Sequence, residues 1–70
     1  MKPRKFFWRW NDGREALDTE MNRRLAARLL RAWRANPDYT VARVVEPGAL
    51  AFRVVRRGYD LTATMIVRAA

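Results

Sequence analysis

The stretch that decides the fold covers residues 39–68 and reads YTVARVVEPGALAFRVVRRGYDLTATMIVR. Apolar and polar side chains alternate along most of it, which is the period of a half-buried β-strand. Pro47-Gly48 suits the two central positions of a type II turn, because Pro fixes φ and Gly accepts a positive φ. Arg57-Gly58 marks a second tight connection. The stretch therefore predicts a three-stranded antiparallel meander, with strands at 39–46, 49–57 and 59–68.

Two-residue turns at these two places bring most apolar side chains of the meander to one face. That face holds Val41, Val45, Leu50, Phe52, Val54, Leu61, Ala63, Met65 and Val67, with Arg43 as the exception. The opposite face is mixed, and its apolar members Val44, Val55 and Ile66 are isolated from one another. We expect the first face to be covered and the second to be open to solvent.

The covering element is predicted as a helix at residues 19–35. At about 100° per residue, its apolar side chains form one continuous arc, made of Met21, Leu25, Ala26, Leu29, Leu30, Ala32 and Trp33. Asp18 would fall inside that arc, so we expect the helix to begin after it, with Asp18 or Thr19 as the N-cap. Asn36-Pro37 ends the helix, because the residue before Pro avoids the α region.

The N-terminal part predicts one strand at residues 5–10, because aromatic residues favour strands, behind a basic tail at 1–4. Asn11-Asp12-Gly13 breaks this strand, and a turn or short helix at 13–17 precedes the main helix. The strand either extends the sheet or covers one of its edges. The expected fold is α+β with the order β-α-β-β-β. One helix packs on one face of a mostly antiparallel sheet of three to four strands, and residues 1–70 form a single domain.

Composition excludes many functions. The chain has 70 residues, 15 basic and 7 acidic side chains, a net charge of +8, and no Cys or His. That removes disulfides, thiol nucleophiles, imidazole chemistry and the usual zinc sites. Four acids lie before or at the predicted helix start, where capping and the helix dipole explain them: Asp12, Glu15, Asp18 and Glu20. We expect no catalytic residues, metal, cofactor or small-molecule substrate. The apolar runs are too short for a membrane span, so we expect no membrane partner.

The basic residues are more informative. Five arginines fall on the helix arc opposite the apolar one, and only Glu20 shares that arc: Arg23, Arg24, Arg28, Arg31 and Arg34, here called the arginine ridge. A solvated helix face ordinarily mixes both signs of charge. A guanidinium fork suits phosphate, since it binds two oxygens at once. The ridge therefore predicts binding to nucleic acid or to the acidic surface of a nucleoprotein complex. A bias toward Arg codons is the alternative, but it leaves the imbalance of charge unexplained.

A second basic patch is expected around the first strand and on the open face of the sheet. Its members are Lys2, Arg4, Lys5, Arg9, Arg53, Arg57 and Arg68. Cations interleaved with aromatic rings, as beside Phe7, hold a nucleic-acid backbone while bases stack.

This arrangement of one N-terminal strand, one helix and a meander turning at Pro47-Gly48 and Arg57-Gly58 resembles several small phage-encoded accessory proteins. Among them are anti-CRISPR proteins that inhibit type I surveillance complexes. The resemblance covers the whole chain and is one of architecture. It implies a stoichiometric inhibitor that occupies a nucleoprotein surface and blocks or diverts target DNA. Because the chain is basic, it would dock on acidic patches or touch nucleic acid instead of imitating DNA.

The expected protein is a non-enzymatic basic binding protein in the cytoplasm of a bacterial host, either a monomer or a homodimer. Two alternatives stay open. One is a protein–protein interaction module without nucleic acid, dimerising through Val44, Val55 and Ile66 or through the aromatic first strand. The other is a small toxin-like ribonuclease.

Overall fold

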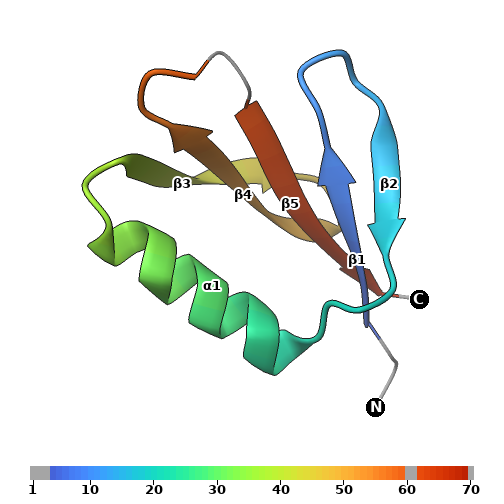
Figure 1. The fold of residues 1–70 in the computed structure, drawn as a ribbon. Coiled ribbons are helices and arrows are strands. Elements are labelled where there is room, and N and C mark those ends of the chain that lie inside the picture. The colour runs from blue at the N-terminus through green and yellow to red at the C-terminus, as the bar shows by residue number, and fades with distance from the viewer. Residues whose placement is uncertain (1–3, 60–61, 70) are drawn as a thin grey trace.

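The computed structural model describes residues 4–59 and 62–69. The elements are β1 (Arg4–Arg9), β2 (Glu15–Asp18), α1 (Arg23–Ala35), β3 (Tyr39–Glu46), β4 (Ala49–Arg56) and β5 (Thr62–Ala69). In this part of the chain, five strands form one sheet in the order β2-β1-β5-β4-β3, and every neighbouring pair is antiparallel. Figure 1 shows α1 lying along one face of the sheet, from the end of β2 to the start of β3. The expected α+β class with one helix on an antiparallel sheet is confirmed.

Strand β2 is the element that sequence reasoning missed. Trp10 and Arg14 close a tight turn through a backbone hydrogen bond of 2.9 Å, and β2 then returns along β1 with Arg9 opposite Glu15. The predicted turn or short helix at 13–17 is therefore wrong, and the element order is β-β-α-β-β-β. Residues 15–18 include good helix formers, but pairing with β1 overrides this weak local preference.

The helix begins at Arg23, four residues later than predicted. Its N-cap is Asn22, whose Oδ1 accepts a hydrogen bond of 2.9 Å from the backbone N–H of Leu25. The prediction of Asp18 or Thr19 as N-cap is wrong, because the Asp18 carboxylate is used at the end of β2. It accepts hydrogen bonds from Trp8 Nε1 at 3.0 Å and from two backbone amides at 3.1 Å. The predicted helix end is confirmed, with Ala35 as the last helical residue.

The meander follows the predicted faces with one change of register. Glu46 lies opposite Ala49, which confirms the two-residue turn at Pro47-Gly48. Val54 lies opposite Ala63, whereas a two-residue turn at Arg57-Gly58 would set it opposite Leu61. Strand β5 accordingly starts at residue 62 instead of 59. A shift of two residues keeps every side chain on its face, so the assignment of faces survives. Residues 60–61 lie outside the described part.

Strand β1 lies inside the sheet, between β2 and the central strand β5. It pairs with β5, from Arg4 opposite Ala69 to Arg9 opposite Thr64, so the first strand extends the sheet. The core lies between α1 and the two strands β1 and β5, and its buried members are Phe6, Ala26, Met65 and Val67. Val45 was expected on the covered face, but its residue is 95% exposed. It is next to the last residue of β3, whereas α1 leads into the first residue of that strand (Figure 1).

The face of the sheet away from the helix is not simply open. Ala51 and Ile66 on this face have no exposed surface, so the expectation of an exposed Ile66 is wrong. Arg9 on β1 reaches Glu46 on β3 with a contact of 2.8 Å, although β5 and β4 lie between these strands. Such a contact requires the sheet to curl, because a flat sheet separates strands by about 4.8 Å each. We call this side the concave face.

Candidate anion-binding surfaces

The arginine ridge lies on the solvent side of α1, and all five of its arginines are exposed. Ala26 marks the opposite side as the buried residue of the helix. At about 100° per residue, Arg24, Arg28 and Arg31 lie roughly 160°, 200° and 140° around the helix from Ala26. These three point directly away from the sheet. Arg23 and Arg34 flank them.

Arg34 is the one ridge residue with a contact to the sheet in the described part of the chain. Its guanidinium carbon lies 5.8 Å from the centre of the Phe52 ring. A cation over a ring face at this distance is weakly attracted, and the guanidinium keeps its charge for a further partner.

The N-terminal part of the ridge is unfavourable for the helix that carries it. The first turn holds no acidic residue, while Arg23 and Arg24 sit at the positive end of the helix dipole, where a cation costs about 0.3–1 kcal/mol. Arg24 and Arg28 are like charges four residues apart, which costs about 0.2–0.5 kcal/mol. Among the described residues, no ridge arginine forms an ion pair within 4.0 Å, and Glu20 pairs with none of them. Helix stability therefore does not explain the ridge.

The length of the ridge can be compared with a nucleic-acid backbone. From Arg23 to Arg34 the helix rises about 16.5 Å at 1.5 Å per residue. A duplex rises about 3.4 Å per base pair, so the five cations extend over about five base-pair steps. Three to five phosphates lie within reach of such a line.

Two arginines of the expected second patch are paired with glutamates of the same chain. Arg9 holds Glu46 through two hydrogen bonds of 2.8 and 3.2 Å and also bonds Glu15 at 2.9 Å. Arg68 bonds Glu15 at 3.0 and 3.3 Å and lies 3.9 Å from Glu46. We call these four residues the Arg–Glu network; it joins β1, β2, β3 and β5.

The Arg–Glu network fixes the charge of its own members. Hydrogen bonds from Arg68 and Arg9 lower the pKa of Glu15, and the hydrogen bond from Arg9 lowers the pKa of Glu46. The same bonds to Glu46 and Glu15 raise the pKa of Arg9. Two cations and two anions balance, so Arg9 and Arg68 offer an outside partner less charge than the sequence suggests.

The remaining members of the second patch do not come together. The register puts Arg4 on the helix side of the sheet, whereas Lys5 and Arg53 lie on the concave face. Arg57 is exposed in the turn after β4. Lys2 lies outside the described residues. The structure thus disperses this patch, while it keeps the ridge on one surface.

A row of aromatic rings, which the sequence did not predict, lies on the face of the sheet that the helix covers. Its successive ring centres are 6.0–6.4 Å apart, and the row is Trp10, Trp8, Trp33 and Tyr39. It continues through Arg56, whose guanidinium carbon lies 5.8 Å from the Tyr39 ring and 4.4 Å from the Tyr59 ring. The signal for Arg56 was its position opposite Tyr39 in the predicted β3–β4 register.

Metal chemistry has no support in the part of the chain that the structure covers, since no group of three or more acidic side chains there could hold an ion. In the same part, no helix has the length and apolar character needed to cross a membrane. No family model, curated protein or solved structure matches this chain.

Proposed function

We propose that this protein is a non-enzymatic binding protein that uses the arginine ridge to grip the phosphate backbone of nucleic acid, free or within a nucleoprotein complex. The observation that carries the proposal is the ridge itself. Five exposed arginines on one helix face have no acidic partner among the described residues. Three of them, Arg23, Arg24 and Arg28, lie where the helix dipole or a neighbouring like charge disfavours a cation.

The geometry suits phosphates better than bases. Arg24, Arg28 and Arg31 project from a helix anchored on the core by Ala26 and Leu30, so their backbone positions are fixed before binding. Each guanidinium can give two parallel hydrogen bonds to a phosphate. Binding then releases condensed counterions, which supplies most of the sequence-independent affinity.

Direct reading of sequence is not expected. In proteins that read a DNA sequence, side-chain amides located next to arginines recognise adenine. Asn22 is the amide nearest the ridge, and its Oδ1 already accepts the helix-capping hydrogen bond from Leu25. The protein should therefore bind many sequences with similar affinity.

The architectural resemblance to small phage-encoded inhibitors supplies a setting for this activity. In that setting the protein acts stoichiometrically in the cytoplasm of a bacterial host and docks the ridge on a CRISPR surveillance complex or a similar nucleoprotein assembly. Its positive charge favours contact with bound nucleic acid or with acidic protein patches.

A salt titration of duplex binding tests the proposal. Binding of a mixed-sequence duplex is measured by mobility shift between low and physiological salt. Three to five phosphate contacts predict a slope of log K against log salt of about −2.7 to −4.5. The variant Arg24→Gln/Arg28→Gln/Arg31→Gln should lower the magnitude of the slope by about 2.7.

The matched control removes three charges elsewhere, as Arg4→Gln/Arg43→Gln/Arg57→Gln, all at exposed positions. It should change the slope much less than the ridge variant. Equal losses in both variants would mean that net charge, and not the ridge, drives binding.

Absence of binding at low salt would refute binding to free nucleic acid. A pull-down from bacterial lysate, with and without nuclease, then tests the nucleoprotein form. Degradation of RNA in the same samples would overturn the non-enzymatic assignment.

A further inference from the structure

The outer edge of β3 is the less protected of the two edges of the sheet. In the order β2-β1-β5-β4-β3, each edge strand has one neighbour within residues 4–59 and 62–69, whereas β1 is paired on both sides. Strand β2 has four residues, two of them acidic, while β3 has eight and a continuous register with β4. Short strands, charges and bulges are the devices that keep an edge from pairing with another chain. Strand β3 is therefore the edge that is open to pairing.

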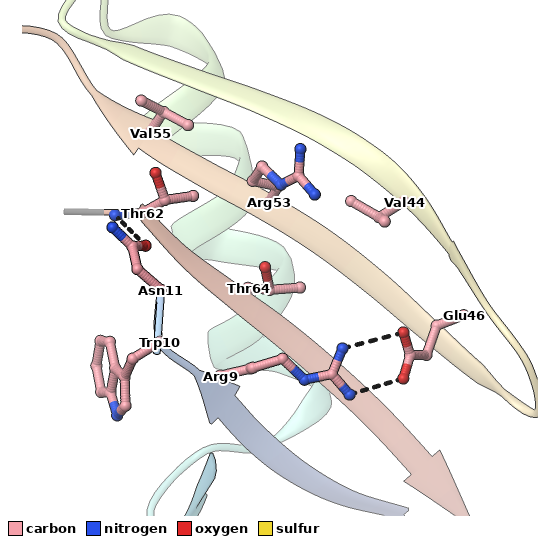
Figure 2. A pocket seen from close by; sticks show the side chains of 9 residues that line it. All are labelled: Arg9, Trp10, Asn11, Val44, Glu46, Arg53, Val55, Thr62 and Thr64. Atoms are coloured by element: carbon pink, nitrogen blue, oxygen red, sulfur yellow. Dashed lines mark hydrogen bonds and ion pairs between the residues drawn. The ribbon is translucent and has the colours of Figure 1, made fainter. Parts of the chain in front are cut away.

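The side chains of β3 add little charge to this edge. Figure 2 shows a hollow of about 490 Å³ on the concave face, with Glu46 and Arg53 among its lining side chains. Glu46 is turned inward there, and both of its oxygens are bonded to Arg9. Arg43 is the other charged residue of β3, and it lies on the helix side opposite Phe52. The outer edge thus carries one charge of its own strand.

The backbone groups that point outward follow from the register. In an antiparallel pair, every second residue exchanges both of its backbone hydrogen bonds with the neighbouring strand. The N–H of Arg57 donates to the carbonyl oxygen of Asp38 at 2.6 Å, so the even-numbered residues of β3 bond to β4. The N–H and C=O groups of Val41, Arg43 and Val45 consequently point away from β4. No described residue bonds to them on that side.

A two-fold arrangement of two β3 strands pairs all three of these residues. When Ala42 lies opposite Ala42 of the second copy, Val41 lies opposite Arg43 and Tyr39 lies opposite Val45. The Val41–Arg43 pairs exchange hydrogen bonds in both directions. The carbonyl oxygen of Tyr39 accepts from Val45, because the N–H of Tyr39 is already bonded in the turn before β3. This register provides about six backbone hydrogen bonds.

The side chains favour the same register. Val45 is 95% exposed, and Tyr39 of the second copy covers it as an aromatic–β-branched pair, one of the favourable cross-strand pairs. The two copies of Arg43 are diagonal neighbours about 7–8 Å apart. A shift of two residues one way would set them directly opposite, which is destabilising. A shift of two residues the other way would leave Val45 beyond the end of the second strand.

We propose that the protein forms a homodimer by antiparallel pairing of β3 with β3 of a second copy, centred on Ala42. The sheet is then continuous across both chains. Both helices lie on the same face, because residues directly opposite across strands share a face. The interface is one strand pair with an apolar contact at each end, and interfaces of this small size are weak. We expect a dissociation constant of about 100 µM, and a monomer below about 5 µM.

Sedimentation equilibrium from about 10 µM to 1 mM tests the proposal. Arg43→Pro removes an outward N–H at the middle of the edge and should leave the chain monomeric over this range. Proline is tolerated on edge strands where the N–H faces solvent, so the variant should keep its melting transition. Arg43→Gln is the matched control, because it removes the same charge but keeps the N–H. It should dimerise at least as tightly as the wild-type chain.

Val45→Lys provides a second variant in case the proline variant does not fold. The position is 95% exposed, so the monomer should be unaffected, whereas the dissociation constant should rise about tenfold or more as the pair with Tyr39 is lost. Val45→Thr keeps the β-branched shape and should lie closer to the wild-type value.

Salt separates this proposal from binding by the ridge. Each chain carries a net charge of +8, so screening of the repulsion between copies should strengthen the dimer, whereas salt weakens binding to nucleic acid. The variant Arg24→Gln/Arg28→Gln/Arg31→Gln should still dimerise, although its binding to a duplex is reduced.

Nuclear Overhauser contacts in a mixture of labelled and unlabelled chains test the register. Contacts between Thr40 of one copy and Val44 of the other support it, and contacts between copies confined to β2 would overturn it. A wild-type chain that stays monomeric up to about 1 mM, or a folded Arg43→Pro variant that dimerises as tightly as Arg43→Gln, would also overturn the proposal.

Discussion

Replacing Ile66 by Ala tests the curl of the sheet. Ile66 is on the face away from the helix, yet it has no exposed surface. In the register it lies between Phe7 on β1 and Ala51 on β4. The side chains of the concave face must therefore cover it, because no helix or second sheet formed by residues 4–59 and 62–69 packs there.

The size of the effect follows from this burial. Ile→Ala removes three carbons, worth about 0.8 kcal/mol each in transfer free energy, and the cavity left behind adds to that sum. We expect a loss of about 3 kcal/mol in the free energy of unfolding. A chain of this size has about 4–10 kcal/mol in total, so the melting temperature should fall by about 12–24 °C.

Urea unfolding followed by circular dichroism measures this loss. Val45→Ala is the matched control, since Val45 is also β-branched and in a strand but is 95% exposed. It should change the free energy of unfolding by about 0.5 kcal/mol or less. Ile66→Val provides a graded step of about 0.5–1.5 kcal/mol if the alanine variant is too unstable to measure.

A flat sheet with a solvated outer face gives the opposite result. In that case Ile66→Ala would cost under about 1 kcal/mol and would resemble Val45→Ala. Such an outcome would refute the curl, the Arg–Glu contact across the sheet and the hollow together.

Two further predictions concern polar contacts. The lowered pKa values of Glu15 and Glu46 stabilise the fold fully above the ordinary glutamate pKa of 4.5. This stabilisation is lost as pH falls through the lowered values. The urea concentration at the midpoint of unfolding should therefore fall as the pH is lowered below 4.5. This dependence on pH should be weaker in Glu46→Gln. Asp18→Ala removes the acceptor of Trp8 Nε1 and of two backbone amides, which should cost about 1–3 kcal/mol in urea unfolding. The exposed Asp12, replaced by Ala as a control, should cost under about 1 kcal/mol. If Asp18→Ala lowers the free energy of unfolding no more than Asp12→Ala does, the role of Asp18 in joining β2 to β1 is contradicted.

Local sequence signals predicted the parts of the fold that depend on local chemistry. Pro47-Gly48 sets its turn within two residues, and the alternating pattern sets the faces of the meander. Those faces survive the shift in register, because the shift is of two residues. The arc of arginines was likewise predictable, since the period of a helix is a property of consecutive residues.

The parts that were missed depend on contacts between segments, which the pattern of one segment does not show. Residues 15–18 form a strand because β1 pairs with them, and their own propensities do not indicate it. The burial of Ile66 and the hollow beside Arg53 depend on the curl of five strands. That curl is accompanied by a contact between Arg9 and Glu46, which are 37 residues apart in sequence. No alternation pattern in a single strand carries this information.

The pairing of β1 with β5 also governs how the chain reaches its fold. Paired residues of these strands are 55 to 65 positions apart, whereas the β1–β2 hairpin and the β3–β4–β5 meander are each closed by local turns. The two local units can form independently, but Phe6, Met65 and Ile66 become buried only when the units dock. Closing so long a loop carries a high entropic cost before any contact offsets it. We therefore expect the folding barrier at the step in which β1 pairs with β5. Helix α1 connects the two units and sets the distance between them before they dock.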